Sequence, residues 1–263
     1  MKLIDFHTHI YPEPIADKAT RNIRRFYGFD EEGGEHGSAE ILLKKGKEGG
    51  ISEFVVLPVA LHPAQVRKIN QNILDEVAAH PEFHGFGTIH PEMEGMMEEA
   101  EFILNSPLHG IKLHPDTQLF NIDDERLFPL YDFMQGKMPL MIHTGDPRYD
   151  YSHPRRLKRV LELFPNLEAI APHFGGWSLF DEALSLLGPK NCWIDLSSSR
   201  QFMSKEQFLR YIEAYGADRV LYGSDFPVWD AKVEAEYFMA LPLKDSDKEK
   251  IAFKNAEKIL KNS

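Results

Sequence analysis

The segment Lys2-Leu-Ile-Asp-Phe-His-Thr-His9 sets a pattern for the whole chain: an apolar run that ends in polar residues. Such a run, followed by a segment with helical spacing, predicts a buried strand and the helix after it. Seven further runs repeat the pattern, at Phe54–Val59, His84–His90, Gly110–His114, Leu140–Thr144, Leu167–His173, Cys192–Ser197 and Val220–Asp225. Most of their centres lie roughly 24 to 31 residues apart, and eight such units predict an α/β fold, the (β/α)8 TIM barrel.

The segments between these runs carry apolar stripes typical of amphipathic helices, at 66–77, 93–104 and 157–164. Ser204 followed by Gln207 is a capping box that predicts a helix start, whereas Pro129 leaves the start of the helix before Met134 open. A doubly wound open sheet has the same alternation of elements. Polar residues at the end of nearly every run favour the barrel, because its functional side chains gather at the carboxyl ends of several strands.

Two segments depart from the repeat. Residues 11–37 form an insertion after the first strand, with Gly28, Gly33 and several acidic residues, and we interpret it as a mobile acidic excursion over the active face. Residues 231–261 read as terminal helices that close the outer ring. The absence of a Pro/Ser-rich linker predicts a single domain over residues 1–263.

The composition is that of a soluble globular protein, with 43% hydrophobic and 27% charged residues among 263. The formal net charge of −11 argues against nucleic acid or an anionic membrane surface as a partner. Cys192 is the sole cysteine and has no partner for an internal disulfide, and the apolar run Phe54–Leu61 is too short to span a bilayer. We expect a cytoplasmic protein, and whether it forms a homo-oligomer stays open.

Histidines and an aspartate at the ends of different runs are candidate metal ligands. His7 and His9 share one face of the first strand, close enough to chelate one ion, although a hydrogen-bonded pair of strand histidines would look the same. With His143 and Asp225 from the fifth and eighth runs, they could fill the coordination sphere of a divalent ion and leave room for water. His173 then stands beside them, as a catalytic group or as a core histidine bonded to backbone.

The chain resembles the amidohydrolase superfamily in the motifs Asp-Phe-His-Thr-His at 5–9, His-Thr-Gly at 143–145, His-Phe-Gly-Gly at 173–176, Gly-Ser-Asp-Phe-Pro at 223–227 and Asn-Ala at 255–256. Within it the motifs are most similar to the amidohydrolase-2 branch, which also contains aminocarboxymuconate-semialdehyde decarboxylase and resorcylate decarboxylase. The resemblance implies a TIM barrel of the metal-dependent hydrolase type. It further implies that His7, His9, His143 and Asp225 hold the metal, with His173 as a catalytic partner.

Lys112 and His114 share a face of the fourth strand and have alternative roles. In some members of the superfamily a carboxylated lysine at this strand bridges two metals, whereas the branch resembled here usually holds one. An interior lysine neutralised by nearby carboxylates is the plainer interpretation, and His114 could touch substrate. We therefore expect one divalent ion, zinc first, with manganese or iron as alternatives and a binuclear centre less favoured.

Loops after the later strands supply candidate substrate contacts. Arg148 or Arg200 could hold a substrate carboxylate in a two-pronged contact, with Tyr149 and Trp229 packing on a flat body. Either arginine could instead pair with a neighbouring acid. The expected substrate is a small carboxylated molecule.

These residues predict first a metal-dependent hydrolase of a small amide, lactone or ester. A bound ion lowers the pKa of its water toward 7, Asp225 would take the proton, and His173 would stabilise the oxyanion or protonate the leaving group. The alternative is a metal-dependent, non-oxidative decarboxylase of a small carboxylated aromatic or semialdehyde substrate. A third, non-catalytic interpretation treats the ion as a structural staple.

Overall fold

The computed structural model describes residues 1–188 and 192–262, and all its paired strands run parallel. One hydrogen-bonded set comprises β1 (Ile4–Thr8), β2 (Glu53–Val56) and β3 (Phe83–Gly85). The other comprises β4 (Gly87–Thr88), β5 (Ile111–Leu113), β6 (Leu140–Ile142), β7 (Ala169–Ala171), β8 (Cys192–Asp195) and β9 (Val220–Leu221). Each of the eight predicted runs overlaps a strand, and the run at 84–90 overlaps both β3 and β4.

The two sets close into a barrel at both seams. Only Phe86 separates β3 from β4; its N–H donates to the Val56 carbonyl (3.0 Å), whereas the N–H of Gly87 donates to the Gly110 carbonyl (2.8 Å). β3 and β4 therefore form one barrel strand that passes from one neighbour to the next. At the other seam Phe6 N–H donates to the Tyr222 carbonyl (2.9 Å) and Thr8 pairs with Phe226. The predicted (β/α)8 barrel is confirmed.

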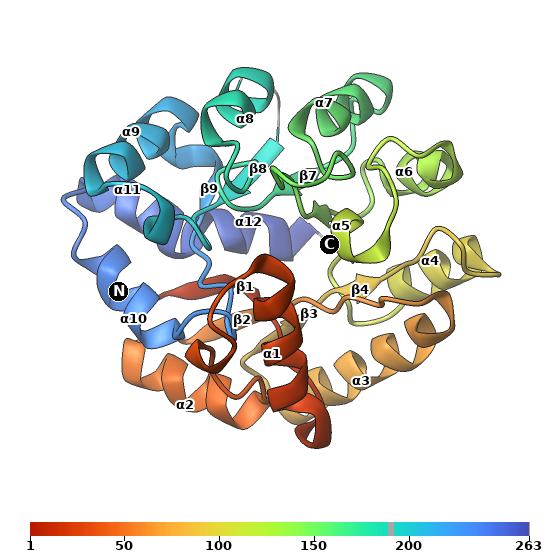
Figure 1. Cartoon of the computed structure of the whole chain (residues 1–263), viewed down its shortest axis with the longest axis horizontal. Coiled ribbons are helices and arrows are strands. Elements are labelled where there is room, and N and C mark those ends of the chain that lie inside the picture. The colour runs from red at the N-terminus through yellow and green to blue at the C-terminus, as the bar shows by residue number, and fades with distance from the viewer. Residues whose placement is uncertain (189–191, 263) are drawn as a thin grey trace.

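Helices surround this barrel, as Figure 1 shows. They are α1 (Ala16–Tyr27), α2 (Ala39–Gly49), α3 (Val66–Ala79), α4 (Met96–Leu104), α5 (Pro115–Gln118), α6 (Phe128–Met134), α7 (Pro154–Leu163), α8 (Phe180–Leu187), α9 (Lys205–Tyr215), α10 (Ala231–Met239), α11 (Asp245–Glu249) and α12 (Asn255–Asn262), with a π-helical segment at Lys250–Lys254. α6 starts at Phe128, so Pro129 falls in its first turn, where a missing N–H does no harm. The Ser204–Gln207 capping box of α9 is present in both directions.

Alternation along the strands separates two apolar clusters. Val55, Met141 and Ile170 belong to an inner cluster with Phe6 and Phe86. Their sequence neighbours, such as Val56, Ile142 and Ala171, belong to the larger cluster under the helices. Because successive side chains of a strand point to opposite faces, each strand supplies both layers.

The insertion at 11–37 differs from the loop that its glycines suggested. It contains the twelve-residue helix α1, which ends at Gly28 in a left-handed conformation (φ 73°). Figure 1 draws α1 in front of the strands, across the mouth of the barrel. His36 holds the far end of the insertion to the start of α1 through contacts with Asp17 (2.5 Å) and Glu13 (3.0 Å). The insertion therefore covers the active face with a helix.

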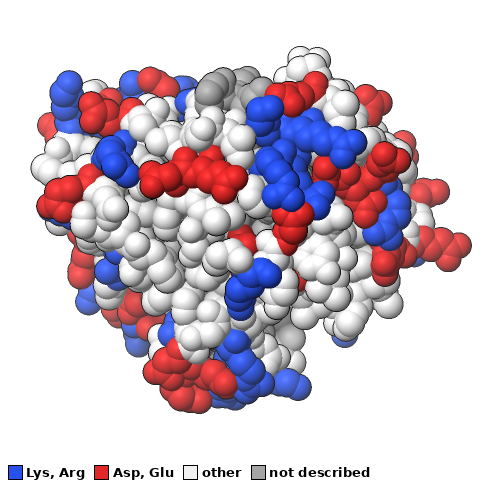
Figure 2. Space-filling model, turned by 45° about the horizontal axis from the view of Figure 1, so that its top comes forward, with Lys and Arg blue, Asp and Glu red and all other residues white. Residues whose placement is uncertain are grey.

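The surface carries charges of both signs. On the face drawn in Figure 2, basic and acidic side chains lie next to one another around a broad uncharged area. Among the helices of the described residues, none has the length and apolarity needed to cross a membrane.

Candidate metal centre

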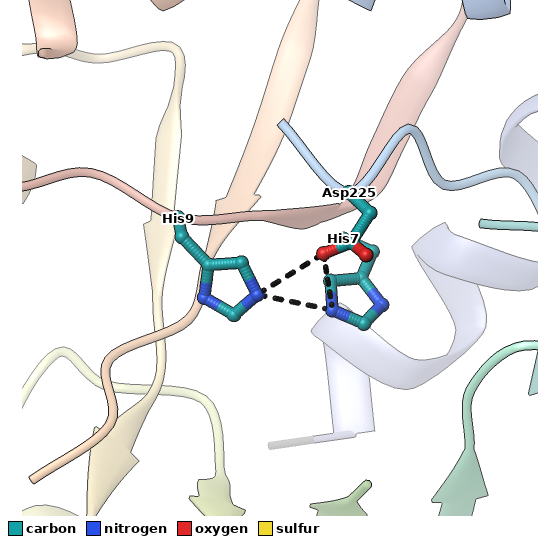
Figure 3. A group of neighbouring side chains, drawn as sticks. All are labelled: His7, His9 and Asp225. Carbon is teal, nitrogen blue, oxygen red and sulfur yellow. Dashed lines mark hydrogen bonds and ion pairs between the residues drawn. The ribbon is translucent and has the colours of Figure 1, made fainter. Parts of the chain in front are cut away.

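Three of the expected ligands meet at the carboxyl ends of β1 and β9. Nε2 of His7 lies 3.2 Å from Nε2 of His9, and Oδ1 of Asp225 lies 3.5 Å and 3.4 Å from these two nitrogens. Figure 3 shows the three side chains pointing toward one another. Gly223 permits the close approach of the two strand ends, because a Cβ there would lie 2.8 Å from Cβ of His7.

The hydrogen-bond partners of Nδ1 in His7 and His9 decide what the Nε2 atoms of the two rings can bind. Nδ1 of His7 lies 2.7 Å from Oδ2 of Asp195, and Nδ1 of His9 lies 2.6 Å from the Leu57 carbonyl. Both partners accept hydrogen bonds, so each imidazole carries its proton on Nδ1 and presents a lone pair at Nε2. Two lone pairs and one carboxylate oxygen therefore converge with no hydrogen between them.

We call Nε2 of His7, Nε2 of His9 and Oδ1 of Asp225 the acceptor triangle. The spacing of these three atoms fits a divalent ion. Ligands at about 2.1 Å from a tetrahedral metal lie about 3.4 Å from one another, and the three distances here are 3.2, 3.4 and 3.5 Å. A carboxylate behind one imidazole and a carbonyl behind the other is the arrangement that orients histidine ligands in metal sites.

The electrostatics of the two carboxylates agree with this. Burial works to raise the pKa of the Asp225 carboxyl, but the charges that His7 and His173 would carry as imidazolium ions, together with a hydrogen bond from His9, outweigh it and hold that pKa well below its usual range. Asp195 has its pKa lowered in the same way, chiefly by His7, against the effect of burial. Both carboxylates are therefore ionised at neutral pH, as ligand and orienting group require.

His143, the fourth expected ligand, lies in a neighbouring group. Within the described residues the ligand atoms of His7, His9 and Asp225 form one group closer than 4.8 Å, and those of His114, Asp116 and His143 form another. The ring of His143 stacks on that of His114, with centroids 4.1 Å apart. Its Nδ1 lies 3.2 Å from Nε2 of His173. The structure thus brings three of the four expected ligands together and places His143 between His114 and His173.

His173 lies beside the triangle rather than in it. Its ring centroid is 5.1 Å from that of His7, and its Nδ1 lies 3.0 Å from the Ser197 carbonyl, which places the proton on Nδ1 and leaves Nε2 as an acceptor. Burial lowers its pKa to about 4, so the ring is neutral at pH 7. His173 and Asp225 both adopt a left-handed backbone (φ 58° and 62°), a strained conformation that clusters at functional sites.

Lys112 points into the same cavity. Its side chain is 1% exposed, and its Nζ has no hydrogen-bond partner among residues 1–188 and 192–262. Burial lowers its pKa to about 8, and the charges of Asp195 and Asp225 oppose that shift, so the amine is still mostly protonated at neutral pH. A buried, protonated amine without a partner is a place for an anion.

The expected substrate contacts after β6, β8 and β9 are not where the sequence placed them. Arg148 forks onto Asp146, with contacts of 2.9 and 2.6 Å, and Arg200 contacts Glu234 at 2.8 Å. Neither arginine lines the cavity, and neither do the two aromatic candidates, Tyr149 and Trp229. Tyr149 is 42% exposed, and Trp229 donates its indole N–H to Ser198 (2.8 Å). Arg200 is half-buried, with a side chain 26% exposed, and such a guanidinium group needs a paired charge. Arg148 is more exposed, at 36%, and pairs with Asp146, whose buried carboxylate needs a cation.

Three residues of the site were missed: Asp116, which shares a group of ligand atoms with His114 and His143, Asp195 and Tyr27. Asp195, at the end of β8, orients His7, and an acid at a strand end was a usable signal. Tyr27, the last residue of α1, places its hydroxyl 2.9 Å from Nε2 of His114 and 3.2 Å from Nε2 of His143. No local pattern marked it, because it reaches the site only through the path of the insertion.

One cavity of about 740 Å³ joins these groups. Its polar end is formed by the following side chains: His7, His9, Lys112, His114, His143, His173 and Asp225. Tyr27, Phe29 and Trp177 cover this end, with Tyr27 packed edge-on against Trp177 at 4.8 Å. The arrangement offers a divalent-ion site, a neutral imidazole and a buried cation in one cavity.

Several solved structures share this fold. An uncharacterised TIM-barrel protein, Bb4693 of Bordetella bronchiseptica, is 24% identical and matches 100% of this chain and 99% of its own with a TM-score of 0.81. The 5-carboxyvanillate decarboxylase LigW of Sphingomonas paucimobilis is 19% identical over 99% of both chains, with a TM-score of 0.73. A dihydroxybenzoic acid decarboxylase of Polaromonas sp. JS666, solved with manganese and the inhibitor 2-nitroresorcinol, is 16% identical over 99% of this chain and 97% of its own, with a TM-score of 0.74.

No protein of curated function matches the sequence. The profile of the family described as Amidohydrolase matches residues 4–261. That span takes in all the motifs on which the resemblance rested and nearly the whole barrel. The chain therefore belongs to the amidohydrolase family, in the amidohydrolase-2 branch.

Proposed function

We propose that the protein is a metal-dependent, non-oxidative decarboxylase of a small carboxylated aromatic or semialdehyde substrate. The observation that carries this proposal is Lys112, whose buried Nζ finds no hydrogen-bond partner within the described part of the chain and lies in the cavity that holds the triangle of His7, His9 and Asp225. A carboxylated substrate supplies the missing partner. Two structurally similar proteins are decarboxylases of carboxylated aromatic compounds, which supports the same choice.

His7, His9 and Asp225 would hold the ion. His143, the fourth expected ligand, lies outside this group and beside His173. Zinc and manganese both accept two imidazoles and a carboxylate. When bound, the ion supplies a positive charge that draws electron density from the substrate's oxygens.

The chain's own residues then have separate tasks. Lys112 binds the carboxylate and Tyr27 covers the polar end of the cavity, which limits the access of water to the reacting carbon. His173 has its lone pair at Nε2, where it could take the proton of a phenolic substrate whose pKa the charges of Lys112 and a bound ion would lower. The bond between the ring carbon and the carboxylate breaks, carbon dioxide leaves, and the electron pair left on carbon takes that proton back from His173.

Hydrolysis of a small amide, lactone or ester remains the second candidate. It is favoured by the ionised carboxylate of Asp225, which stands at the ion site where it can accept a proton from water. The two candidates share the ligands and differ in the use of Lys112, since a neutral ester or amide gives that cation no partner.

The test uses protein purified without added metal and analysed for its metal content. It is mixed with 5-carboxyvanillate, 2,6-dihydroxybenzoate and semialdehyde acids, and released carbon dioxide is measured alongside a panel of lactones and amides. Decarboxylation requires carbon dioxide release that falls at least about tenfold in kcat/KM in Lys112→Met, the worth of one charge-assisted contact. Lactone or amide turnover without carbon dioxide, equal in Lys112→Met, would establish hydrolysis instead.

A further inference from the structure

The cavity is far larger than a small carboxylated ring needs. An apolar cavity of about 150 Å³ already holds benzene, whereas this one measures about 740 Å³. The polar groups of the site occupy one end. Much of the rest of the lining comes from α1 and from the segment that leads out of β2 into α3, with further residues from the segment after β1, from α5 and its C-cap, and from the loops that carry Trp177 and Val228. The surplus space therefore extends away from the histidines, toward the side of the barrel where Figure 1 draws α1 and α3.

The walls of this extension are largely apolar, although Asn22 of α1 and Gln65, Lys68 and Asn72 on the α3 side also line the cavity. On one side Ala19, Ile23 and Phe26 of α1 line the cavity, at a spacing that places them on one face of the helix. On the other side Leu61 and Ile69 line it, from the loop before α3 and from α3 itself. We call this extension the α1–α3 groove.

The groove opens through a rim of exposed aliphatic side chains. Ile15 is 49% exposed, Leu61 is 51% exposed and Leu119 is 69% exposed, and all three line the cavity. Leu119 also has a left-handed backbone (φ 60°), which a leucine adopts only under constraint. Single exposed apolar residues are ordinary, but several around one opening mark a surface that binds an apolar partner.

We infer that the α1–α3 groove binds an apolar arm of the substrate, so that the substrate is amphiphilic. Its carboxylated head lies at Lys112 and the ion site, and an alkyl or aryl substituent extends between α1 and α3 toward Ile15 and Leu61. This inference rests on the proposed function for the position of the head. The occupant is a part of the substrate because the groove is continuous with the polar end of the same cavity.

The test is calorimetric titration of the metal-loaded protein with salicylate, 4-propylsalicylate and 4-hexylsalicylate. Each methylene that leaves water for an apolar wall improves the dissociation constant by about fourfold, so the propyl compound should bind at least about tenfold more tightly than salicylate. In Ala19→Trp the indole fills the groove, and the ratio of dissociation constants between salicylate and the hexyl compound should fall close to one.

A matched pair of variants tests the rim. Ile15→Glu should reduce the gain from the hexyl chain, whereas Leu163→Glu, at an equally exposed leucine on α7 (50%) outside the cavity lining, should retain it. Equal affinities along the series, a chain-length gain that survives Ala19→Trp, or no binding by any of the three compounds would overturn the inference. A rim covered by a second copy would instead make sedimentation of Ile15→Glu differ from that of Leu163→Glu, with affinities that ignore chain length.

Carbon dioxide release measured on the same compounds separates this inference from the proposed function. Affinity that rises with the length of the alkyl chain, without any release of carbon dioxide, supports binding of an apolar arm in the groove and refutes decarboxylation. Carbon dioxide release with no dependence of affinity on chain length refutes the groove and retains decarboxylation.

Discussion

His7 and Asp225 lie together at the mouth of the barrel, with Nε2 of one 3.5 Å from Oδ1 of the other. They come from opposite ends of the chain and meet because β1 and β9 are neighbours at the barrel seam. The backbone enforces the pairing, since the N–H of Asp225 donates to the carbonyl of His7 (2.8 Å). The position of the ion site is therefore tied to closure of the barrel.

Asp225→Asn should strip the protein of metal. The substitution removes the one negative charge among the three converging atoms, and we expect metal affinity to fall by more than about 100-fold. Elemental analysis after dialysis measures this. Asp181→Asn, at an exposed acid of α8, is the matched control and should keep its metal; full metal content in Asp225→Asn would contradict the ligand assignment.

Asp195→Asn should weaken metal binding less severely, by about 10- to 100-fold. Asp195 holds Nδ1 of His7 at 2.7 Å without reaching the acceptor triangle. An amide in its place no longer holds the proton on Nδ1, so Nε2 presents its lone pair for a smaller fraction of the time. Competition with a chelating dye gives the affinity, and a loss as large as that in Asp225→Asn would make Asp195 a ligand rather than an orienting group.

His173→Asn should leave the metal in place and lower kcat by about 10² to 10⁴, the usual contribution of a proton-transfer group. The reason is geometric: His173 lies beside the triangle and bonds instead to Ser197 and His143. Metal content and turnover are measured on the same preparation. Loss of metal in this variant would show a different ligand set or a second ion.

Tyr27→Phe should lower the free energy of unfolding by about 1 kcal/mol, the net value of one buried hydrogen bond. The hydroxyl is the link between α1 and the imidazoles of His114 and His143. Urea denaturation measures the change. Tyr149→Phe, which removes a hydroxyl from an exposed ring nearby, should leave the free energy of unfolding unchanged. Equal effects of the two substitutions would show that the hydroxyl of Tyr27 does not hold α1 to the site.

His109 should make the protein less stable in acid. Burial, helped by the nearby His84, lowers its pKa to about 4, whereas an unfolded chain has a histidine pKa of about 6.5. The neutral ring is favoured in the folded state, so its stability is fully present above pH 6.5 and is lost as the pH falls toward 4. Urea midpoints at pH 7.5 and 5 should differ less in His109→Gln than in the unsubstituted protein; an identical loss in both would refute this role.

The spacing of residues along the sequence was enough to predict the strands, the helices and the barrel. Strand-length apolar runs, the helical stripes and the Ser204–Gln207 box depend on neighbours a few residues apart, so the sequence predicts them directly, and the barrel and the family are confirmed. The facing of His7 and His9 follows from the two-residue repeat of a strand. On function, the family is confirmed, whereas the choice between the hydrolase that the sequence placed first and the decarboxylase alternative stays a proposal.

The order of residues is enough to say which segments form strands and helices and which face of each strand carries the chemistry, because these depend on side chains repeating along one short element. Which distant groups share a space depends on how the chain packs in three dimensions. It paired Arg148 with Asp146 and Arg200 with Glu234, set His143 between His114 and His173, and brought Tyr27 over the cavity. These outcomes depend on the paths of loops and on competition among charges that local periodicity does not record, since an arginine binds whichever acid the packed chain brings within reach.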